Sequence, residues 1–213
     1  MGLNGTLADF SGVLFLKHCC MTTTNIEKNA HGISLILAAG LLTASTFYWQ
    51  NGEYSVPAAT LLILSIFFWI PAFIGLFGLF KRSMPRYAVY GLWIAVFGCI
   101  SGICFAFLGY LASVFNISHL EYLEQLSAYP FSSQLLLFAS GPLFPVSIIV
   151  PGITLAVSKK LPTWQCILFS LAGAAFPVSR IARNQTVAHL ADLLFLVACT
   201  SIAISFLKRR SSF

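Results

Sequence analysis

Six long apolar segments alternate with short polar segments along this chain. A helix needs about 20 mostly apolar residues to cross a bilayer, and six segments reach that length. They are residues 30–49, 57–80, 88–115, 132–158, 163–180 and 186–207. Each must be helical, because a chain in lipid has to satisfy its own backbone hydrogen bonds. The pattern therefore predicts an all-α membrane protein, a bundle of six transmembrane helices.

Basic residues are concentrated in alternate loops, and this predicts the orientation of the bundle. Ten of the twelve Lys and Arg residues fall on one side of a six-helix arrangement: Lys17, Lys28, Lys81, Arg82, Arg86, Lys159, Lys160, Lys208, Arg209 and Arg210. The other side holds Glu53, Glu121 and Glu124, together with Arg180 and Arg183. Cytoplasmic loops carry the excess of Lys and Arg, so we expect both termini to be cytoplasmic.

The segments outside the helices are predicted to be cytoplasmic tails, residues 1–29 and 208–213. Met21 begins MTTTNIEKN, a polar lead-in that is typical of a protein start. Our hypothesis is that residues 1–20 are an upstream extension or a disordered tail. With this arrangement we expect a multi-pass protein of the bacterial inner membrane.

The composition narrows the class of protein further. Of 213 residues, 58% are hydrophobic and 8% are charged, whereas a soluble domain carries roughly a quarter charged residues. The outer surface is therefore expected to face the lipid bilayer. The formal net charge of +6 follows from the basic cytoplasmic loops, so we expect no nucleic-acid partner. The six Cys show no CxxC and no metal-ligand spacing, and we predict no disulfide framework, metal site or cofactor.

The third segment carries small residues every three or four positions, so they share one helix face. These are Ala95, Gly98, Gly102, Ala106, Gly109 and Ser113. Small faces let helices approach closely in lipid, and Gly98 and Gly102 form a GxxxG pair. The face is interpreted either as a packing seam inside the bundle or as the interface of a homo-oligomer.

The fourth segment contains Pro142, Pro145 and Pro151, and each removes a helix hydrogen bond. We expect this helix to be kinked or opened in its outer half. The freed carbonyls need partners, which the hydroxyls of Ser140 and Ser147 could supply. Such a helix is either a kinked structural element or a broken helix that lines a cavity, as in transporters.

The turn between the last two segments, PVSRIARNQTVAHLAD, places four ionisable groups beside the membrane: Arg180, Arg183, His189 and Asp192. The turn is short, so its helices are antiparallel neighbours, and Asp192 lies about 10 Å inside the sixth segment at 1.5 Å per residue. A carboxylate at that depth costs a few kcal/mol unless it is paired. Arg180 is the nearest predicted cation, His189 is second, and local pairing with Asp192 is predicted for both arginines.

The cluster is either a structural ion pair or a polar pocket on the non-cytoplasmic side. The fourth segment, Glu53, His119, Glu121 and Glu124 could contribute to that pocket.

Known intramembrane enzymes fit poorly. A rhomboid protease needs GxSG, but Phe138 stands where the first Gly should be, before Ser140 and Gly141. Ceramidases need several intramembrane His, but of the four His in this chain only His189 lies near a plausible site, and the paired His that a haem protein needs on facing helices are not present. We therefore assign no catalytic residue. The alternative interpretation is a hydrolase acting on lipid or peptide with Ser140, His189 and Asp192.

The run SGPLFPVSIIVPGITLAVSKKLPTW, followed later by AHLADLLFLVA, resembles small uncharacterised bacterial integral membrane proteins over about residues 140–210. The resemblance implies a six- or seven-helix bundle and brings no known activity. The expectation is a non-enzymatic, transporter-like, ligand-sensing or accessory bundle. Its pocket would take a small-molecule or lipid ligand at Arg180, Arg183, His189, Asp192 or Ser140.

Overall fold

The structure is a computed structural model that describes residues 25–50 and 52–208. Its long helices are α2 (Asn25–Phe47), α3 (Val56–Gly78), α4 (Pro85–Phe115), α7 (Leu143–Val157), α8 (Thr163–Ala182) and α9 (Gln185–Lys208). Three short elements lie between α4 and α7: α5 (His119–Ser127), α6 (Pro130–Ser133) and the π-helical turn η1 (Gln134–Phe138). The hypotheses on residues 1–20 and on the residues after Lys208 lie outside the described part of the chain.

The six predicted helices are present, each within a few residues of its predicted bounds. Six stretches of the described residues are long and apolar enough to cross a membrane, the fourth being Pro130–Val157. The largest shift is at the first helix, which begins at Asn25. Residues 25–29, which were assigned to the N-terminal tail, are therefore the first residues of α2. Insertion into a membrane, its identity and the orientation of the termini remain predictions.

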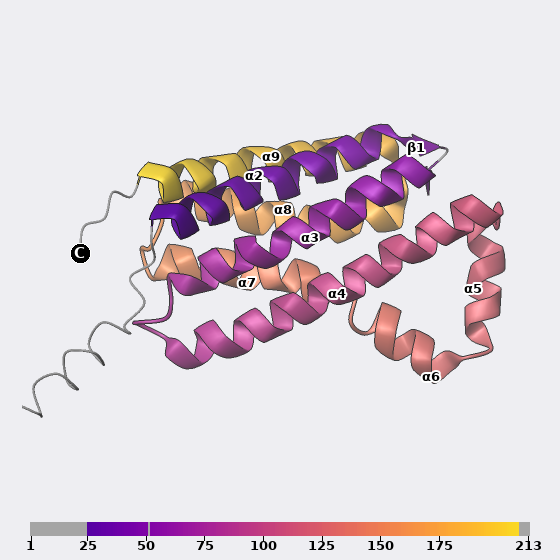
Figure 1. Ribbon diagram of the computed structural model, residues 1–213, viewed down its shortest axis with the longest axis horizontal. Coiled ribbons are helices and arrows are strands. Elements are labelled where there is room, and N and C mark those ends of the chain that lie inside the picture. The colour runs from indigo at the N-terminus through magenta and orange to yellow at the C-terminus, as the bar shows by residue number, and fades with distance from the viewer. Residues whose placement is uncertain (1–24, 51, 209–213) are drawn as a thin grey trace, which may run out of the picture.

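The six helices form a closed ring. Contacts run from α2 to α3, α3 to α4, α4 to α7, α7 to α8, α8 to α9, and from α9 back to α2. The first helix begins and the last helix ends at the same end of the bundle (Figure 1). That end also carries the α3–α4 and α7–α8 turns, where the basic residues of the loops lie. The opposite end, called the outer end below, carries the α2–α3 and α8–α9 turns and α5.

The centre of the ring is filled by aromatic side chains around Trp69 of α3, which is fully buried. Its ring contacts Phe73, Phe144, Phe169 and Phe195, with centroid distances from 5.3 to 6.1 Å. These residues come from four helices, so one cluster joins α3, α7, α8 and α9. The pairs of Trp69 with Phe144 and with Phe195 are edge-to-face, a geometry that adds to the packing of a bundle interior.

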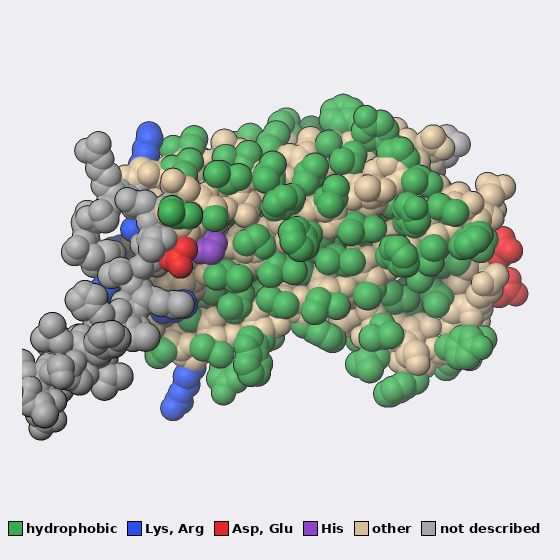
Figure 2. Space-filling view, in the orientation of Figure 1, with side chains coloured by type: hydrophobic (Ala, Val, Ile, Leu, Met, Phe, Trp, Pro, Cys, Tyr) green, Lys and Arg blue, Asp and Glu red, His purple; other side chains and the backbone are tan. Residues whose placement is uncertain are grey.

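The face of the bundle seen in Figure 2 is covered by hydrophobic side chains. Trp93, Phe97 and Phe107 of α4 are all exposed, as expected for a helix that faces lipid. In this view the Lys and Arg side chains lie at one end of the molecule, whereas acidic side chains lie at both ends. A hydrophobic surface between two polar ends is the pattern expected of helices that are long enough to cross a bilayer.

The face of α4 that carries the small residues packs against neighbouring helices of the same chain. A Cβ atom added at Gly98 would lie 2.7 Å from the backbone nitrogen of Phe144, and one added at Gly102 would lie 3.1 Å from Ile66. Gly98 therefore permits the close approach of α7, and Gly102 contacts α3. Of the two interpretations of this face, the packing seam is the one observed. An oligomer through the Gly98 and Gly102 face is untested, and within one chain those positions are already in contact.

The fourth helix is opened, as its prolines predicted. After η1 the chain turns through Ala139–Pro142, and α7 begins at Leu143. Pro142 and Pro145 lie at the start of α7, where a missing N–H costs little. Pro151 lies inside α7, which continues through it. The opening is therefore located between η1 and α7, toward the outer end.

Two outer elements were not predicted. Strands β1 (Trp49–Gln50) and β2 (Glu53–Tyr54) form an antiparallel hairpin between α2 and α3, with Trp49 opposite Tyr54. Gly52 has φ of 80°, in the left-handed region that favours glycine. Its Asn-Gly dipeptide was the available signal for such a turn. Helix α5 occupies a segment that was interpreted as a loop.

Candidate functional site

Arg180 and Asp192 form a buried ion pair at the outer end of α8 and α9. Arg180 Nη2 donates to Asp192 Oδ1 at 2.9 Å and to Oδ2 at 3.1 Å. Asp192 is fully buried and the Arg180 side chain is 10% exposed. The pairing predicted from the short α8–α9 turn is therefore confirmed.

Residues from α2 and the hairpin complete the surroundings of this pair. The Thr46 hydroxyl donates to Asp192 Oδ2. The Arg180 guanidinium lies 4.8 Å from the Trp49 ring centroid and 5.1 Å from that of Phe176. A cation between two aromatic rings is held by its charge and by packing. The pair thus joins α2, α8, α9 and the β1–β2 hairpin, and its partners hold Arg180 in place.

Arg183 does not pair with Asp192, and that part of the prediction was wrong. Its Nη1 donates to Glu53 Oε1 in β2. Arg183 ends α8 in the left-handed conformation, with φ of 48°. The chain leaves the helical path at this residue, and the Arg183 side chain pairs with the β1–β2 hairpin. The side chains of Arg183 and Glu53 are 29% and 51% exposed, and exposed pairs of this kind contribute about 0–1 kcal/mol.

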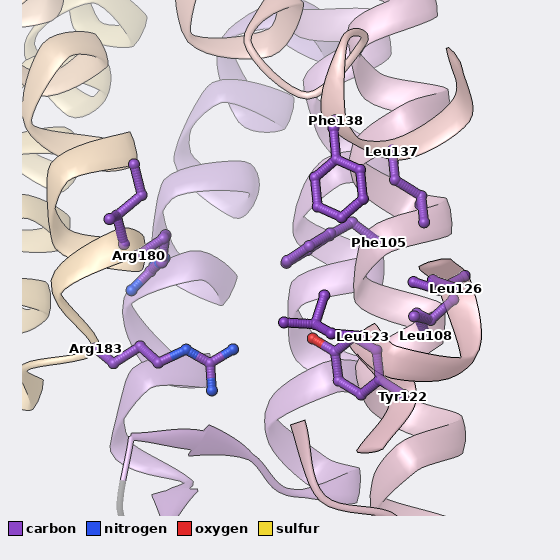
Figure 3. A pocket seen from close by; sticks show the side chains of 10 residues that line it. Phe105, Leu108, Tyr122, Leu123, Leu126, Leu137, Phe138, Arg180 and Arg183 are labelled. Atoms are coloured by element: carbon purple, nitrogen blue, oxygen red, sulfur yellow. The ribbon is translucent and has the colours of Figure 1, made fainter. Parts of the chain in front are cut away.

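A pocket of about 330 Å³ lies between the outer end of α8 and the elements α4, α5 and η1 (Figure 3). It is open to the outside of the bundle, since the lining side chains of Ile181 and Phe138 are 84% and 45% exposed. Most of its lining is apolar, and its polar residues are Arg180, Arg183 and Tyr122. The apolar lining residues are Phe105, Leu108, Leu123, Leu126, Leu137, Phe138 and Ile181. Volumes of about 300–1,000 Å³ are typical of sites for small ligands. The opened fourth helix does line this cavity, through Leu137 and Phe138.

The polar and apolar groups of the pocket are separated along its length. Arg183 and Tyr122 lie nearest the β1–β2 hairpin, whereas Phe138 and Leu137 lie at the opposite end (Figure 3). Phe105 is ten residues before the end of α4 at Phe115, about 15 Å along the helix at 1.5 Å per residue. The pocket therefore extends from a polar rim into the hydrophobic part of the bundle.

Tyr122 keeps its proton at the rim over the ordinary pH range. Partial burial raises the pKa of the Tyr122 phenol, and the charge and hydrogen bonding of Arg183 lower it by less. The phenol is thus a neutral hydroxyl that can donate or accept a hydrogen bond. Arg183 contacts both Glu53 and Tyr122, so it links the hairpin to α5 across the rim.

Ser140 is placed away from this pocket and makes structural hydrogen bonds. Its hydroxyl lies 2.6 Å from that of Ser101 in α4 and donates to the Leu136 carbonyl at 2.8 Å. Ser101 donates to the same carbonyl at 3.0 Å. The two hydroxyls thus satisfy a carbonyl at the opening of the fourth helix, as was predicted for Ser140.

His189 also lies apart from the pocket lining. Its ring packs on Phe47 of α2, with 4.5 Å between centroids. Within the part of the chain that is described, no hydrogen bond joins Ser140 to His189 or to Asp192. The hydrolase interpretation required these three side chains to meet, and the structure gives them separate partners.

The acidic residues proposed for the pocket have other positions. Glu53 pairs with Arg183 at the rim, and Glu121 and Glu124 are exposed on α5. The side chain of His119 lies outside the described atoms. Among described residues, no group of three His, Cys, Asp or Glu side chains is arranged to hold a metal ion. The residues that sequence reasoning missed are Tyr122 and the apolar lining, because a scattered set of Leu and Phe has no signature in an apolar sequence.

Comparison of the chain with protein-family models, with curated proteins and with solved structures gives no match.

Proposed function

We propose that this chain is a non-enzymatic, multi-pass protein of the bacterial inner membrane that binds a small ligand in its outer half. The termini are cytoplasmic in this proposal, and the pocket beside α5 faces the non-cytoplasmic side. Support comes from the six apolar helices, the hydrophobic surface and the basic loops at one end. The weak resemblance of residues 140–210 to small bacterial membrane proteins agrees with this proposal.

The observation that carries the proposal is the pocket itself. It has the volume of a small-molecule site and a few polar groups above apolar walls. In the centre of the bundle, inward from the pocket, the core is filled by the aromatic cluster around Trp69. A pocket at one end of a filled core favours ligand sensing or an accessory role over a continuous transport path.

A photoactivatable alkyl probe tests whether this pocket is occupied. The protein is reconstituted in nanodiscs, labelled by illumination, and the labelled peptides are identified by mass spectrometry. We expect labelling of α4, α5 and η1, and we expect its loss in Leu108→Trp, which fills the pocket with a larger side chain. Leu64→Trp is the matched control, because Leu64 lies on α3 and is 44% exposed.

Two outcomes would contradict the proposal. One is labelling spread evenly over all lipid-facing helices, which would indicate partition into the bilayer and no site. The other is equal labelling of the pocket peptides in Leu108→Trp and Leu64→Trp.

A further inference from the structure

The two arginines that line the pocket are oriented differently. The Arg180 guanidinium is turned to Asp192 and Thr46, away from the cavity. The Arg183 side chain extends into the cavity toward Tyr122 (Figure 3), and its carboxylate partner Glu53 is not part of the lining. An anionic group inside the pocket would therefore meet the Arg183 guanidinium first, and a cationic group would be repelled.

The two arginines differ in how firmly they are held. Arg180 donates to both oxygens of a buried carboxylate and lies against Trp49 and Phe176. Arg183 pairs with Glu53, and both of those side chains are partly exposed. Exposed pairs are weak, so a second carboxylate or phosphate can replace Glu53 at small cost. Arg183 is thus the cation that can change partner, and Arg180 is the fixed one.

The order of groups along the pocket sets the shape of the ligand. Arg183 and Tyr122 form the rim, and the apolar walls continue inward past Leu108 to Phe105 and Phe138 (Figure 3). The volume of about 330 Å³ is at the low end for small-ligand sites. This volume suits one hydrocarbon chain better than two.

We propose that the pocket binds an amphiphile with an anionic headgroup and a single inserted hydrocarbon chain. The headgroup displaces the Glu53 carboxylate from Arg183 and accepts a hydrogen bond from the Tyr122 hydroxyl. The chain lies along Leu108 toward Phe105 and Phe138. This inference rests on the proposed function and adds the chemical class of the ligand. The ligand is either a free single-chain amphiphile or a bilayer phospholipid that inserts one of its chains.

Three photoactivatable probes with the same alkyl chain and different headgroups test this inference. The headgroups are a carboxylate, a hydroxyl and a trimethylammonium, and each is titrated against the protein in phosphatidylcholine nanodiscs. We expect the carboxylate probe to label the pocket at about tenfold lower concentration than the hydroxyl probe, because hydrogen bonds to charged groups are the stronger ones. The trimethylammonium probe is expected to label least.

Substitutions of the two residues of the Arg183–Glu53 pair are expected to change carboxylate-probe labelling in opposite directions. Arg183→Gln should remove the preference for carboxylate while hydroxyl-probe labelling persists. Glu53→Gln should strengthen carboxylate labelling severalfold, because Arg183 loses its competing partner. Arg86→Gln is the control, since Arg86 is an exposed arginine at the opposite end of the bundle.

The outcomes separate this inference from the proposed function. Equal labelling of the pocket by all three probes, or a carboxylate preference that survives Arg183→Gln, overturns the inference and leaves the pocket as a ligand site. Absence of pocket labelling by every probe overturns both. Adding phosphatidylglycerol to the nanodiscs identifies the source. Competition with the carboxylate probe supports a bilayer lipid, and labelling that persists supports a free amphiphile.

Discussion

Removing the Arg180 guanidinium is the most informative perturbation of the buried ion pair. In Arg180→Ala the carboxylate of the fully buried Asp192 loses two hydrogen bonds, at 2.9 and 3.1 Å. Of the described donors to this carboxylate, Thr46 remains. Breaking a buried pair on one side costs about 3–5 kcal/mol, because the remaining charge is uncompensated. Loss of the contacts with Trp49 and Phe176 adds about 0.5–1 kcal/mol each. The expected loss in the free energy of unfolding is about 4–7 kcal/mol.

Substitutions of Asp192 and of both partners separate charge from packing. Asp192→Asn keeps an oxygen that can accept from Thr46 and leaves Arg180 between its aromatic rings. We therefore expect the free energy of unfolding to fall by about 1–3 kcal/mol. The double variant Arg180→Leu with Asp192→Leu removes both charges, and such replacements are often nearly neutral. We therefore expect the double variant to be more stable than Arg180→Ala.

Reversible unfolding in mixed micelles, titrated with a denaturing detergent, measures these free energies. Arg183→Ala is the matched control, because its pair with Glu53 is exposed and contributes at most about 1 kcal/mol. A loss below about 1 kcal/mol in Arg180→Ala would refute the reasoning. So would a double variant whose loss equals the sum of the two single leucine substitutions.

Three further predictions concern packing, titration and orientation. Gly98→Ala should destabilise the bundle by about 1–3 kcal/mol, because its Cβ would lie 2.7 Å from the Phe144 backbone nitrogen. Gly40→Ala, whose Cβ meets nothing within 4 Å, should instead stabilise α2 by about 0.5–1 kcal/mol, and equal effects would contradict the packing seam. The raised pKa of Tyr122 predicts that its phenol titrates above the usual value of about 10. Folded protein favours the protonated phenol, so the contribution of Tyr122 to stability is present below pH about 10 and is lost as the pH rises through the folded-state pKa. The phenolate absorbance of wild type minus Tyr122→Phe measures this pKa, and a midpoint at or below 10 would exclude the expected burial effect. In a variant without native cysteines, Asn184→Cys should react with an impermeant maleimide in intact cells, and Ser83→Cys should react only after permeabilisation. The reverse pattern would show that the orientation is inverted.

Local features of the chain were sufficient to predict its helices. Lipid leaves no alternative to helices for long apolar runs, so the six runs predicted the six helices observed. The three prolines of the fourth segment predicted the opening before α7. The α8–α9 turn is short and sets the register of its helices, so the Arg180–Asp192 pair was predictable as well.

The remaining part of the site depends on contacts between distant segments. Glu53 and Arg183 are 130 positions apart and meet only because the β1–β2 hairpin lies beside the end of α8. The chain leaves the helical path at Arg183, and that side chain pairs with the hairpin in place of the predicted partner. The pocket forms only because α5 and η1 lie beside α8. In an almost wholly apolar sequence, the hydrophobic periodicity does not predict which Leu and Phe side chains will face one another. Hydrophobic runs and turn lengths thus determined the helices and one local ion pair, whereas the ring closure of the bundle decided which charges and which apolar side chains surround a cavity.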